Sequence, residues 1–231
     1  DKLTKLKEEG TKEVGEALLL KRTALAGVLD LSIAETKSLH ERLLAFGEHE
    51  SELVVLQEEL LNKLNAYRVH LLKEKARLSD VEDSNGMKVF AQTLNDWRGD
   101  IYNVEVKKVI EFLLVGQTQE AIKTADVRFS KLSFYVKRGV RSSPGKTKEV
   151  ELLLGQAARD IKEARLAYGK SREILLTYIP LEENGVASEL KIKERIVAEQ
   201  PMVSDLVAEA LAHIKGAYAS FLKIARLLAG N

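Results

Sequence analysis

Apolar residues recur at helical spacing along almost the whole chain. In the first third they are separated by three, four and seven residues, the spacing of a heptad seam along one side of a helix. The members of this seam are Leu39, Leu43, Phe46, Leu53, Leu60, Leu64, Tyr67, Leu71 and Leu78. No proline occurs between Asp1 and Ser143. The pattern predicts one nearly continuous helix over residues 2–78, and Gly47 with His49 marks where it would bend or divide into two helices.

A polar stretch then interrupts the seam. Residues 79–86 combine three acidic side chains with an Asn-Gly dipeptide, which is typical of turns. Helical spacing resumes at about Met87 and predicts a second helix over residues 87–138, disturbed near residues 95–100. We therefore expect the chain to reverse direction at residues 79–86.

Further helices are expected after a second turn at residues 139–146, where Ser, Pro and Gly cluster. Thr147 belongs to the residue types that cap helices, and it predicts the start of a helix over residues 147–178. A short helix over residues 188–199 and a final helix over residues 201–229 follow. The final helix has the cleanest seam, in which alanine alternates with large side chains.

Together these elements predict an all-α fold. We expect residues 1–231 to form a single elongated antiparallel helical bundle, with a three-helix core of long, coiled-coil-like helices and one short extra helix. The composition agrees, because Leu, Ala, Glu and Lys dominate and aromatic residues are only 6% of the chain. The helices over residues 2–78 and 87–138 would form a hairpin, with the turn between them at the far end of a rod.

Charge changes this picture only locally. The chain has 36 basic and 35 acidic residues, so no overall field favours nucleic acid, and no nucleic-acid partner is expected. Residues 127–148 nevertheless contain no acid, whereas the first turn is acidic. The candidate interaction residues are Asp80, Glu82, Asp83 and Trp97 at the distal end, and Lys137, Arg138, Arg141 and Lys146 at the basic turn.

Each candidate surface also has a purely structural interpretation. The basic residues suit a solvated helix end, where cations complement the helix dipole. Trp97 is either a recognition anchor near an exposed tip or, as is more common, a side chain that fixes a loop to the core.

The chemistry-bearing residue types do not form a catalytic or cofactor-binding pattern. The chain has no cysteine, and its histidines, His40, His49, His70 and His213, lack the spacings of helix-borne metal sites. A phosphate-loop-like run from Gly139 to Thr147 has five residues between its glycines where the motif needs four. We therefore expect no enzymatic activity, no cofactor and no bound metal.

The absence of cysteine and the alanine-rich stretches at residues 207–212 and 217–219 give the sequence a recognisable character. It resembles the glutamic acid/alanine-rich surface proteins of trypanosomes, whose fold is similar to that of the N-terminal domains of variant surface glycoproteins. The resemblance covers the whole chain and is architectural. It implies a non-enzymatic cell-surface coat protein, held on the membrane by a glycosylphosphatidylinositol anchor outside this chain. Partners would be neighbouring coat proteins or a host or vector macromolecule.

Two other functions compete with the coat hypothesis. A cytoplasmic membrane-binding or cytoskeletal scaffold would use the basic turn, although such scaffolds need basic residues along one concave face. A helical pore-forming toxin would need an apolar segment of about 20 residues able to insert into a bilayer, and the sequence contains none. The order of preference is coat protein, scaffold, toxin.

Overall fold

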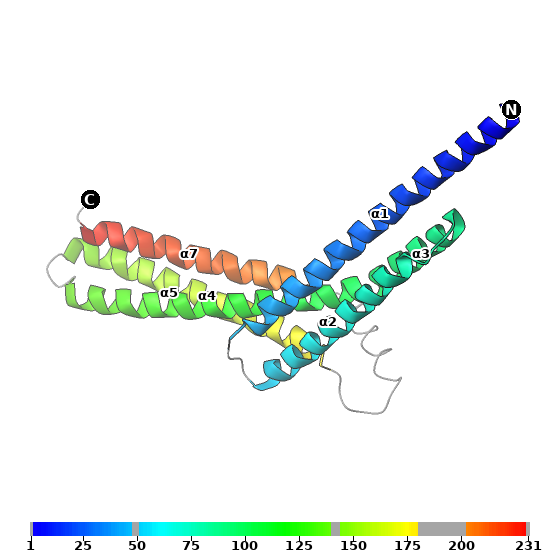
Figure 1. The fold of residues 1–231 in the computed structure, drawn as a ribbon. Helices are drawn as coiled ribbons and strands as arrows, with labels where there is room; N and C mark the ends of the chain where they lie inside the picture. The colour runs from blue at the N-terminus through cyan, green and yellow to red at the C-terminus, as the bar shows by residue number, and fades with distance from the viewer. Residues whose placement is uncertain (1, 48–50, 140–143, 180–201, 230–231) are drawn as a thin grey trace. The chain divides into compact units, whose positions relative to one another are not determined.

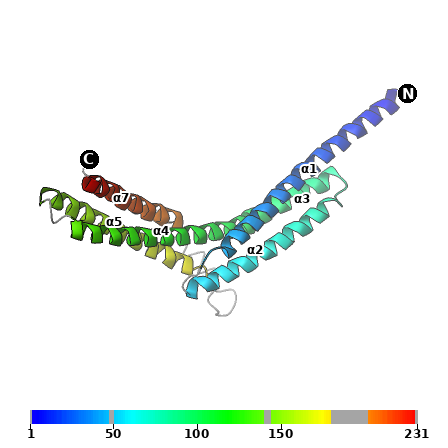
Figure 2. The same cartoon turned by 60° about the vertical axis from the view of Figure 1, so that its left-hand side comes forward.

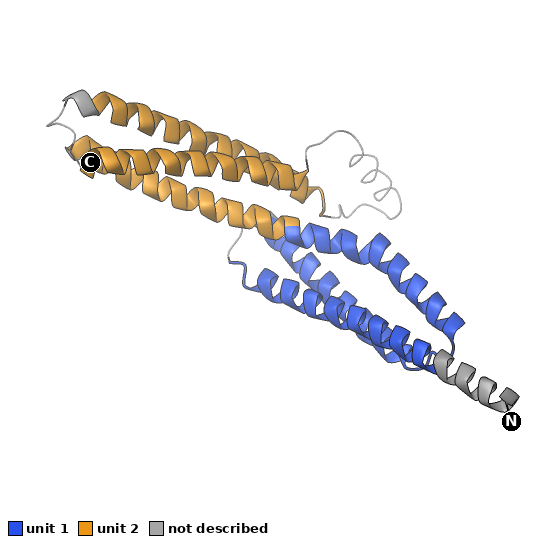
Figure 3. Cartoon of the chain, turned by 90° about the horizontal axis from the view of Figure 1, so that it is seen from above, with its two compact units in different colours: residues 1–110 blue, residues 111–231 orange. Residues whose placement is uncertain are grey.

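A computed structural model describes residues 2–47, 51–139, 144–179 and 202–229. The elements in these ranges are helices, several of them long and packed antiparallel, so the predicted all-α class is confirmed. The chain divides into two compact units, residues 1–110 and residues 111–231 (Figure 3). This division differs from the single bundle that the sequence suggested.

The first unit is built on two antiparallel helices, α1 (Lys2–Leu44) and α2 (Ser51–Leu78), as Figures 1 and 2 show. The prediction of one continuous helix over residues 2–78 was therefore wrong, whereas the alternative of two helices that divide near Gly47 is confirmed. Seam leucines from both helices, including Leu39, Leu43, Leu53, Leu60, Leu64 and Leu71, are buried. A heptad seam serves a hairpin as well as a single rod, because its two halves can pack against each other.

Gln57 explains how the end of α1 is stabilised. The last carbonyl groups of a helix have no partner within it. The Gln57 side chain on α2 donates from Nε2 to the carbonyl oxygen of Leu43 at 2.6 Å and to that of Phe46 at 3.3 Å. A polar residue on the seam thus fixes the α1–α2 reversal.

The second reversal precedes α3 (Ser84–Trp97). Asp83 is the N-cap, and its Oδ1 accepts a 2.6 Å hydrogen bond from the backbone N–H of Gly86. The turn was expected to extend through Asn85 and Gly86, but both lie in the first turn of α3 and Gly86 has no positive φ. The carboxylate cap allows the helix to begin at Ser84 rather than at the expected Met87.

A π-helix, η1 (Arg98–Tyr102), continues α3 and leads into α4 (Asn103–Gly139). The Asn103 N–H donates to the carbonyl oxygen of Arg98, five residues back, which is the π-helical pattern. The disturbance predicted near residues 95–100 corresponds to this segment. The α4 helix then continues without a break to Gly139.

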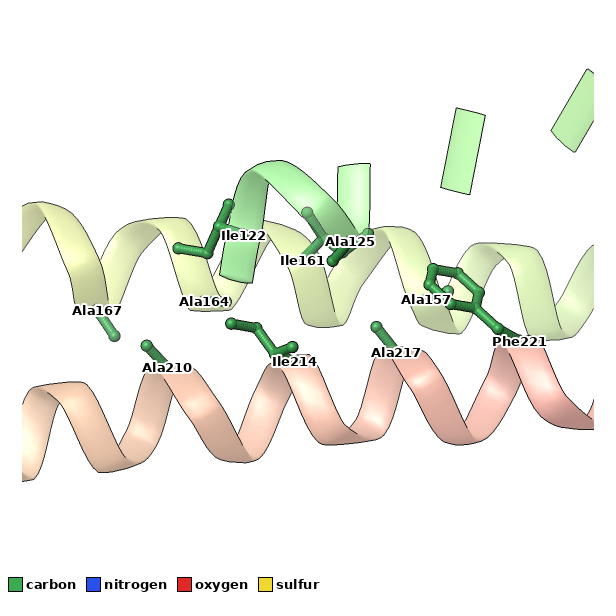
Figure 4. Packing of buried hydrophobic residues seen from close by; sticks show 10 residues of the cluster. All are labelled: Ile122, Ala125, Ala157, Ile161, Ala164, Ala167, Ala210, Ile214, Ala217 and Phe221. Carbon is green, nitrogen blue, oxygen red and sulfur yellow. The ribbon is translucent and has the colours of Figure 1, made fainter. Parts of the chain in front are cut away.

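The second unit packs α4 residues from 111 onward with α5 (Pro144–Leu176) and α7 (Val203–Ala229). Small and large side chains alternate between α5 and α7 (Figure 4). The central cluster contains Ile122, Ala125, Ala157, Ile161, Ala164, Ala167, Ala210, Ile214, Ala217 and Phe221. Alanines with no exposed surface allow the two backbones to approach closely.

Some predicted boundaries differ from the structure. Thr147 is not an N-cap, because α5 already begins at Pro144, and proline is well suited to the first turn of a helix. Leu228 continues the apolar spacing of the final helix, four residues after Ile224, but is 42% exposed. The short helix predicted over residues 188–199 lies outside the described residues.

Candidate functional site

The acidic turn is exposed, but part of it serves the fold. Asp80, Glu82 and Asp83 are all exposed. Asp83 is occupied as the cap of α3. The α1 helix holds the turn in place, because the Arg22 guanidinium donates to the Val81 carbonyl oxygen. Asp80 and Glu82 are therefore the acidic side chains of this turn that face solvent on a fixed backbone.

Trp97 is not part of that acidic surface. It ends α3, whose 14 residues separate it from the turn by about 20 Å. Its ring stacks on Tyr102 at 5.6 Å between centroids, lies 4.2 Å from the ring of His70, and meets Tyr67 edge-on at 5.8 Å. These contacts fix the end of α3 to α2, which is the structural interpretation of Trp97.

The π-helix beside Trp97 carries a buried hydroxyl. Tyr102 has no exposed surface, and its Oη lies 2.9 Å from Thr36 Oγ1 and 3.0 Å from Glu35 Oε2. A phenol has one proton and a carboxylate is the strongest acceptor within reach, so we assign that proton to the bond with Glu35. Burial, with the adjacent Glu35 carboxylate, raises the pKa of Tyr102 to about 12.

A shallow pocket lies between α1 and η1 in the first unit. Its volume is about 320 Å³, and it is lined by Arg98 of η1 and by Val28, Leu31, Ser32 and Glu35 of α1. The Arg98 guanidinium carbon is 6.0 Å from the centre of the Tyr102 ring. Its Nε is buried and has no hydrogen-bond partner in the described part of the chain. The pocket thus combines a cation, a carboxylate and two aliphatic side chains.

The basic residues are described in part. Lys137 and Arg138 are exposed in the last turn of α4, whereas the side chains of Arg141 and Lys146 lie outside the described residues. The sequence reasoning overlooked Phe134 and Tyr135, which are 54% and 65% exposed. The Arg138 guanidinium carbon lies 5.1 Å from the centre of the Phe134 ring. The sequence did contain a signal for these two residues: they are adjacent aromatic residues inside an acid-free run, next to a buried position of the same helix.

These residues extend into one exposed helical face, which we call the α4 basic face. Helical spacing places on it Val127, Arg128, Lys131, Phe134, Tyr135 and Arg138, all of them exposed. The opposite side of α4 is buried through Ala125 and Val136. The face therefore presents cations and apolar groups together on one side of a packed helix.

Glu111 and His213 of the second unit have internal partners. Glu111 is 4% exposed, and its Oε2 accepts a 2.8 Å hydrogen bond from the Tyr178 hydroxyl. His213 Nδ1 lies 3.5 Å from Asp160 Oδ1. His40, His70 and His213 are half-buried, and His49 lies outside the described residues. Within the described ranges, no three potential metal ligands lie close enough together to hold an ion.

Comparison with known proteins gives no match: no protein family, curated protein or solved structure is similar to this chain at a significant level. None of the helices in the described part of the chain combines the length and apolarity needed to cross a bilayer.

Proposed function

We propose that this chain is a non-enzymatic cell-surface coat or interaction protein, displayed on a membrane through a lipid anchor outside these 231 residues. The observation that carries the proposal is the use of the interior for packing. Alanine and aliphatic layers fill the α5–α7 interface. The buried hydroxyl of Tyr102 bonds to α1, and the buried carboxylate of Glu111 bonds to the turn after α5.

The exposed surface supports a role in contacts with other molecules. Long helices held by internal packing carry short exposed turns at their ends, and function in such proteins is concentrated on those turns. The turn with Asp80 and Glu82 is both exposed and fixed to α1. Its partners in this proposal are neighbouring coat proteins or a host or vector macromolecule.

Labelling of intact cells tests the proposal. An antibody raised against residues 79–86 should stain the source cells without permeabilisation, because the turn faces outward. A phosphatidylinositol-specific phospholipase should then release the protein into the medium. Staining that requires permeabilisation would contradict surface display. Protein that stays on the cells after phospholipase treatment would contradict the anchor.

The α4 basic face favours a second candidate, a scaffold that binds anionic membranes. Lys131 and Arg138 would contact lipid phosphates, and Phe134 would enter the interfacial region. Each cation near an anionic surface contributes about 1 kcal/mol, so the face would bind weakly and in a salt-sensitive way.

Vesicle sedimentation separates the two candidates. The scaffold predicts binding to phosphatidylserine-containing vesicles in low salt, lost in high salt and in the double variant Lys131→Glu with Arg138→Glu. The matched control is Lys162→Glu with Lys170→Glu, because both lysines are exposed on α5 and the charge change is equal. The coat hypothesis predicts that the unaltered protein stays in the supernatant in low salt.

A further inference from the structure

The pocket between α1 and η1 has a composition that packing does not explain. Its five lining residues are Val28, Leu31, Ser32, Glu35 and Arg98. Its volume of about 320 Å³ lies near the lower limit of small-molecule sites, which span about 300–1,000 Å³. It therefore has room for a small molecule.

The backbone beside the pocket is irregular in a way that is frequent at functional sites. A π-helical turn inserts one residue into a helix and re-aims the side chains around it, at some cost in stability. Here the π-helix begins with Arg98 and ends with Tyr102. It places the Arg98 side chain in the pocket and the Tyr102 hydroxyl against α1.

Arg98 is held in position without a polar partner. Its guanidinium lies beside the Tyr102 ring, and the Nε hydrogen is buried with no acceptor among the residues that the structure describes. A buried donor without an acceptor is costly, so the position of Arg98 is not explained by a hydrogen bond through Nε. A ligand in the pocket cannot reach the enclosed Nε, but a ligand carboxylate would bind the Arg98 guanidinium that lines the pocket through its Nη hydrogens.

Glu35 restricts which carboxylates fit. Its Oε2 accepts the Tyr102 proton, which fixes the side chain and leaves Oε1 available. An anionic ligand near Glu35 is repelled unless it also carries a cation. An ammonium group on the ligand would meet Oε1, while Val28 and Leu31 offer an aliphatic surface beside it.

We propose that this pocket binds a free α-amino acid with an aliphatic side chain, its carboxylate on Arg98, its ammonium on Glu35 and its side chain against Val28 and Leu31. This binding site is independent of the coat function and requires no chemical step.

Trp97 makes the proposal measurable in the intact protein. It is the single tryptophan of the chain, it precedes Arg98, and its ring stacks on Tyr102. Its fluorescence therefore reports on this site. Titration with L-leucine should give a saturable change. Leucine analogues lacking one charge, 4-methylpentanoate and 3-methylbutylamine, should bind at least about tenfold more weakly, because each loses a charge-assisted hydrogen bond.

Substitutions test whether Arg98 binds the carboxylate of leucine and Glu35 its ammonium group. Arg98→Gln and Glu35→Gln should each weaken leucine binding by at least about tenfold. Arg42→Gln and Glu58→Gln are the matched controls, because both residues are exposed elsewhere on this unit, and they should bind as the unaltered protein does. Glu35→Gln keeps an oxygen that can accept the Tyr102 hydrogen bond, so it removes the charge and keeps that contact. Arg98→Lys keeps the positive charge but loses the paired hydrogen bonds, so it should also weaken leucine binding.

Three results would overturn the proposal. The first is the absence of a saturable fluorescence change with leucine up to about 10 mM. A dissociation constant above that concentration would be too weak for a specific site of this kind. The second is equal binding of leucine and 4-methylpentanoate, which would indicate a simple carboxylate site. The third is unchanged leucine binding in Arg98→Gln. The analogue series uses the unaltered protein, so it remains decisive if a variant fails to fold.

Discussion

The hydroxyl group of Tyr178 donates a 2.8 Å hydrogen bond to Oε2 of Glu111, linking the turn after α5 to α4 within the second unit. Glu111 is 4% exposed, so its carboxyl oxygens need hydrogen-bond donors supplied by the protein. Burial, and next the hydrogen bond to this carboxylate, raises the pKa of Tyr178 above its ordinary value. The pair thus fixes the turn after α5 to α4 through a buried hydrogen bond.

Removing that donor should destabilise the second unit. We expect Tyr178→Phe to lower the free energy of unfolding by about 1–3 kcal/mol, because a buried carboxylate loses a hydrogen bond. Urea unfolding followed by circular dichroism measures the change. Tyr135→Phe is the control, since Tyr135 is 65% exposed and should lose almost nothing. Equal effects of the two substitutions would show that the Glu111 bond contributes no net stability.

A second prediction concerns alkaline pH. The pKa of Tyr102 is about 12 in the folded chain and about 10 when unfolded. Below pH 10 the Tyr102 hydroxyl keeps its proton in both the folded and the unfolded chain, and its contribution to the free energy of unfolding is fully present. Between pH 10 and 12 only the folded state keeps it, so the free energy of unfolding falls with rising pH, by up to about 1.4 kcal/mol per unit for this group.

The comparison with Tyr102→Phe isolates that contribution. Lysines also titrate in this window, but they do so in both proteins and cancel in the difference. Urea unfolding at about pH 9, 10.5 and 11.5 should show a shallower decline for the variant. Parallel declines would mean that the Tyr102 hydroxyl has the same proton affinity in the folded and unfolded chains.

The helices themselves were predictable from the sequence, but their pairing was not. The spacing that predicted seam positions such as Leu43, Leu60 and Leu64 identifies a buried face, and all three are buried. It does not say which other face covers it. The same leucines fit a rod over residues 2–78 or the α1–α2 hairpin, and the side-chain hydrogen bonds of Gln57 to the end of α1 favour the hairpin.

The candidate sites were less predictable, because they depend on contacts between helices. Trp97 and the acidic residues Asp80 and Glu82 are close in sequence, yet α3 separates them. Arg98 and Glu35 line one pocket although they are far apart in the sequence, and no local pattern joins the two. Composition indicated the basic run, whereas the exposure of Phe134 followed from which side of α4 is buried.

Two helical glycines should respond differently to substitution by alanine. A Cβ at Gly169 on α5 would have no other atom within 4 Å, so Gly169→Ala should stabilise by about 0.5–1 kcal/mol through the lower entropy of the unfolded chain. At Gly216 a Cβ would lie 2.8 Å from Asp160 Oδ2. The Asp160 carboxylate, which also lies 3.5 Å from His213 Nδ1, must then shift, so Gly216→Ala should increase stability less than Gly169→Ala does.

A double-mutant cycle tests this explanation. If the contact with Asp160 limits the gain, the addition of Asp160→Ala should restore most of it, so the two substitutions are coupled. Urea unfolding of the four proteins gives the coupling energy. Additive effects within about 0.3 kcal/mol would show that the carboxylate moves aside without cost.

The last prediction concerns the close approach of α5 and α7. Ala164 and Ala217 have no exposed surface and lie in the cluster between these helices (Figure 4). A leucine at position 164 would need space that the neighbouring backbone occupies. We expect Ala164→Leu to destabilise the protein by about 1–3 kcal/mol, the usual cost of overpacking a well-packed core.

Ala158→Leu is the matched control, because Ala158 lies on the exposed side of the same helix and the added side chain has room. Helix propensities of alanine and leucine differ little, so the control should change stability by less than about 0.5 kcal/mol. Thermal unfolding of both variants measures the contrast. If Ala164→Leu were as stable as Ala158→Leu, the interface would be loose enough to accept a large side chain, and alanine would not be required for the pairing of these helices.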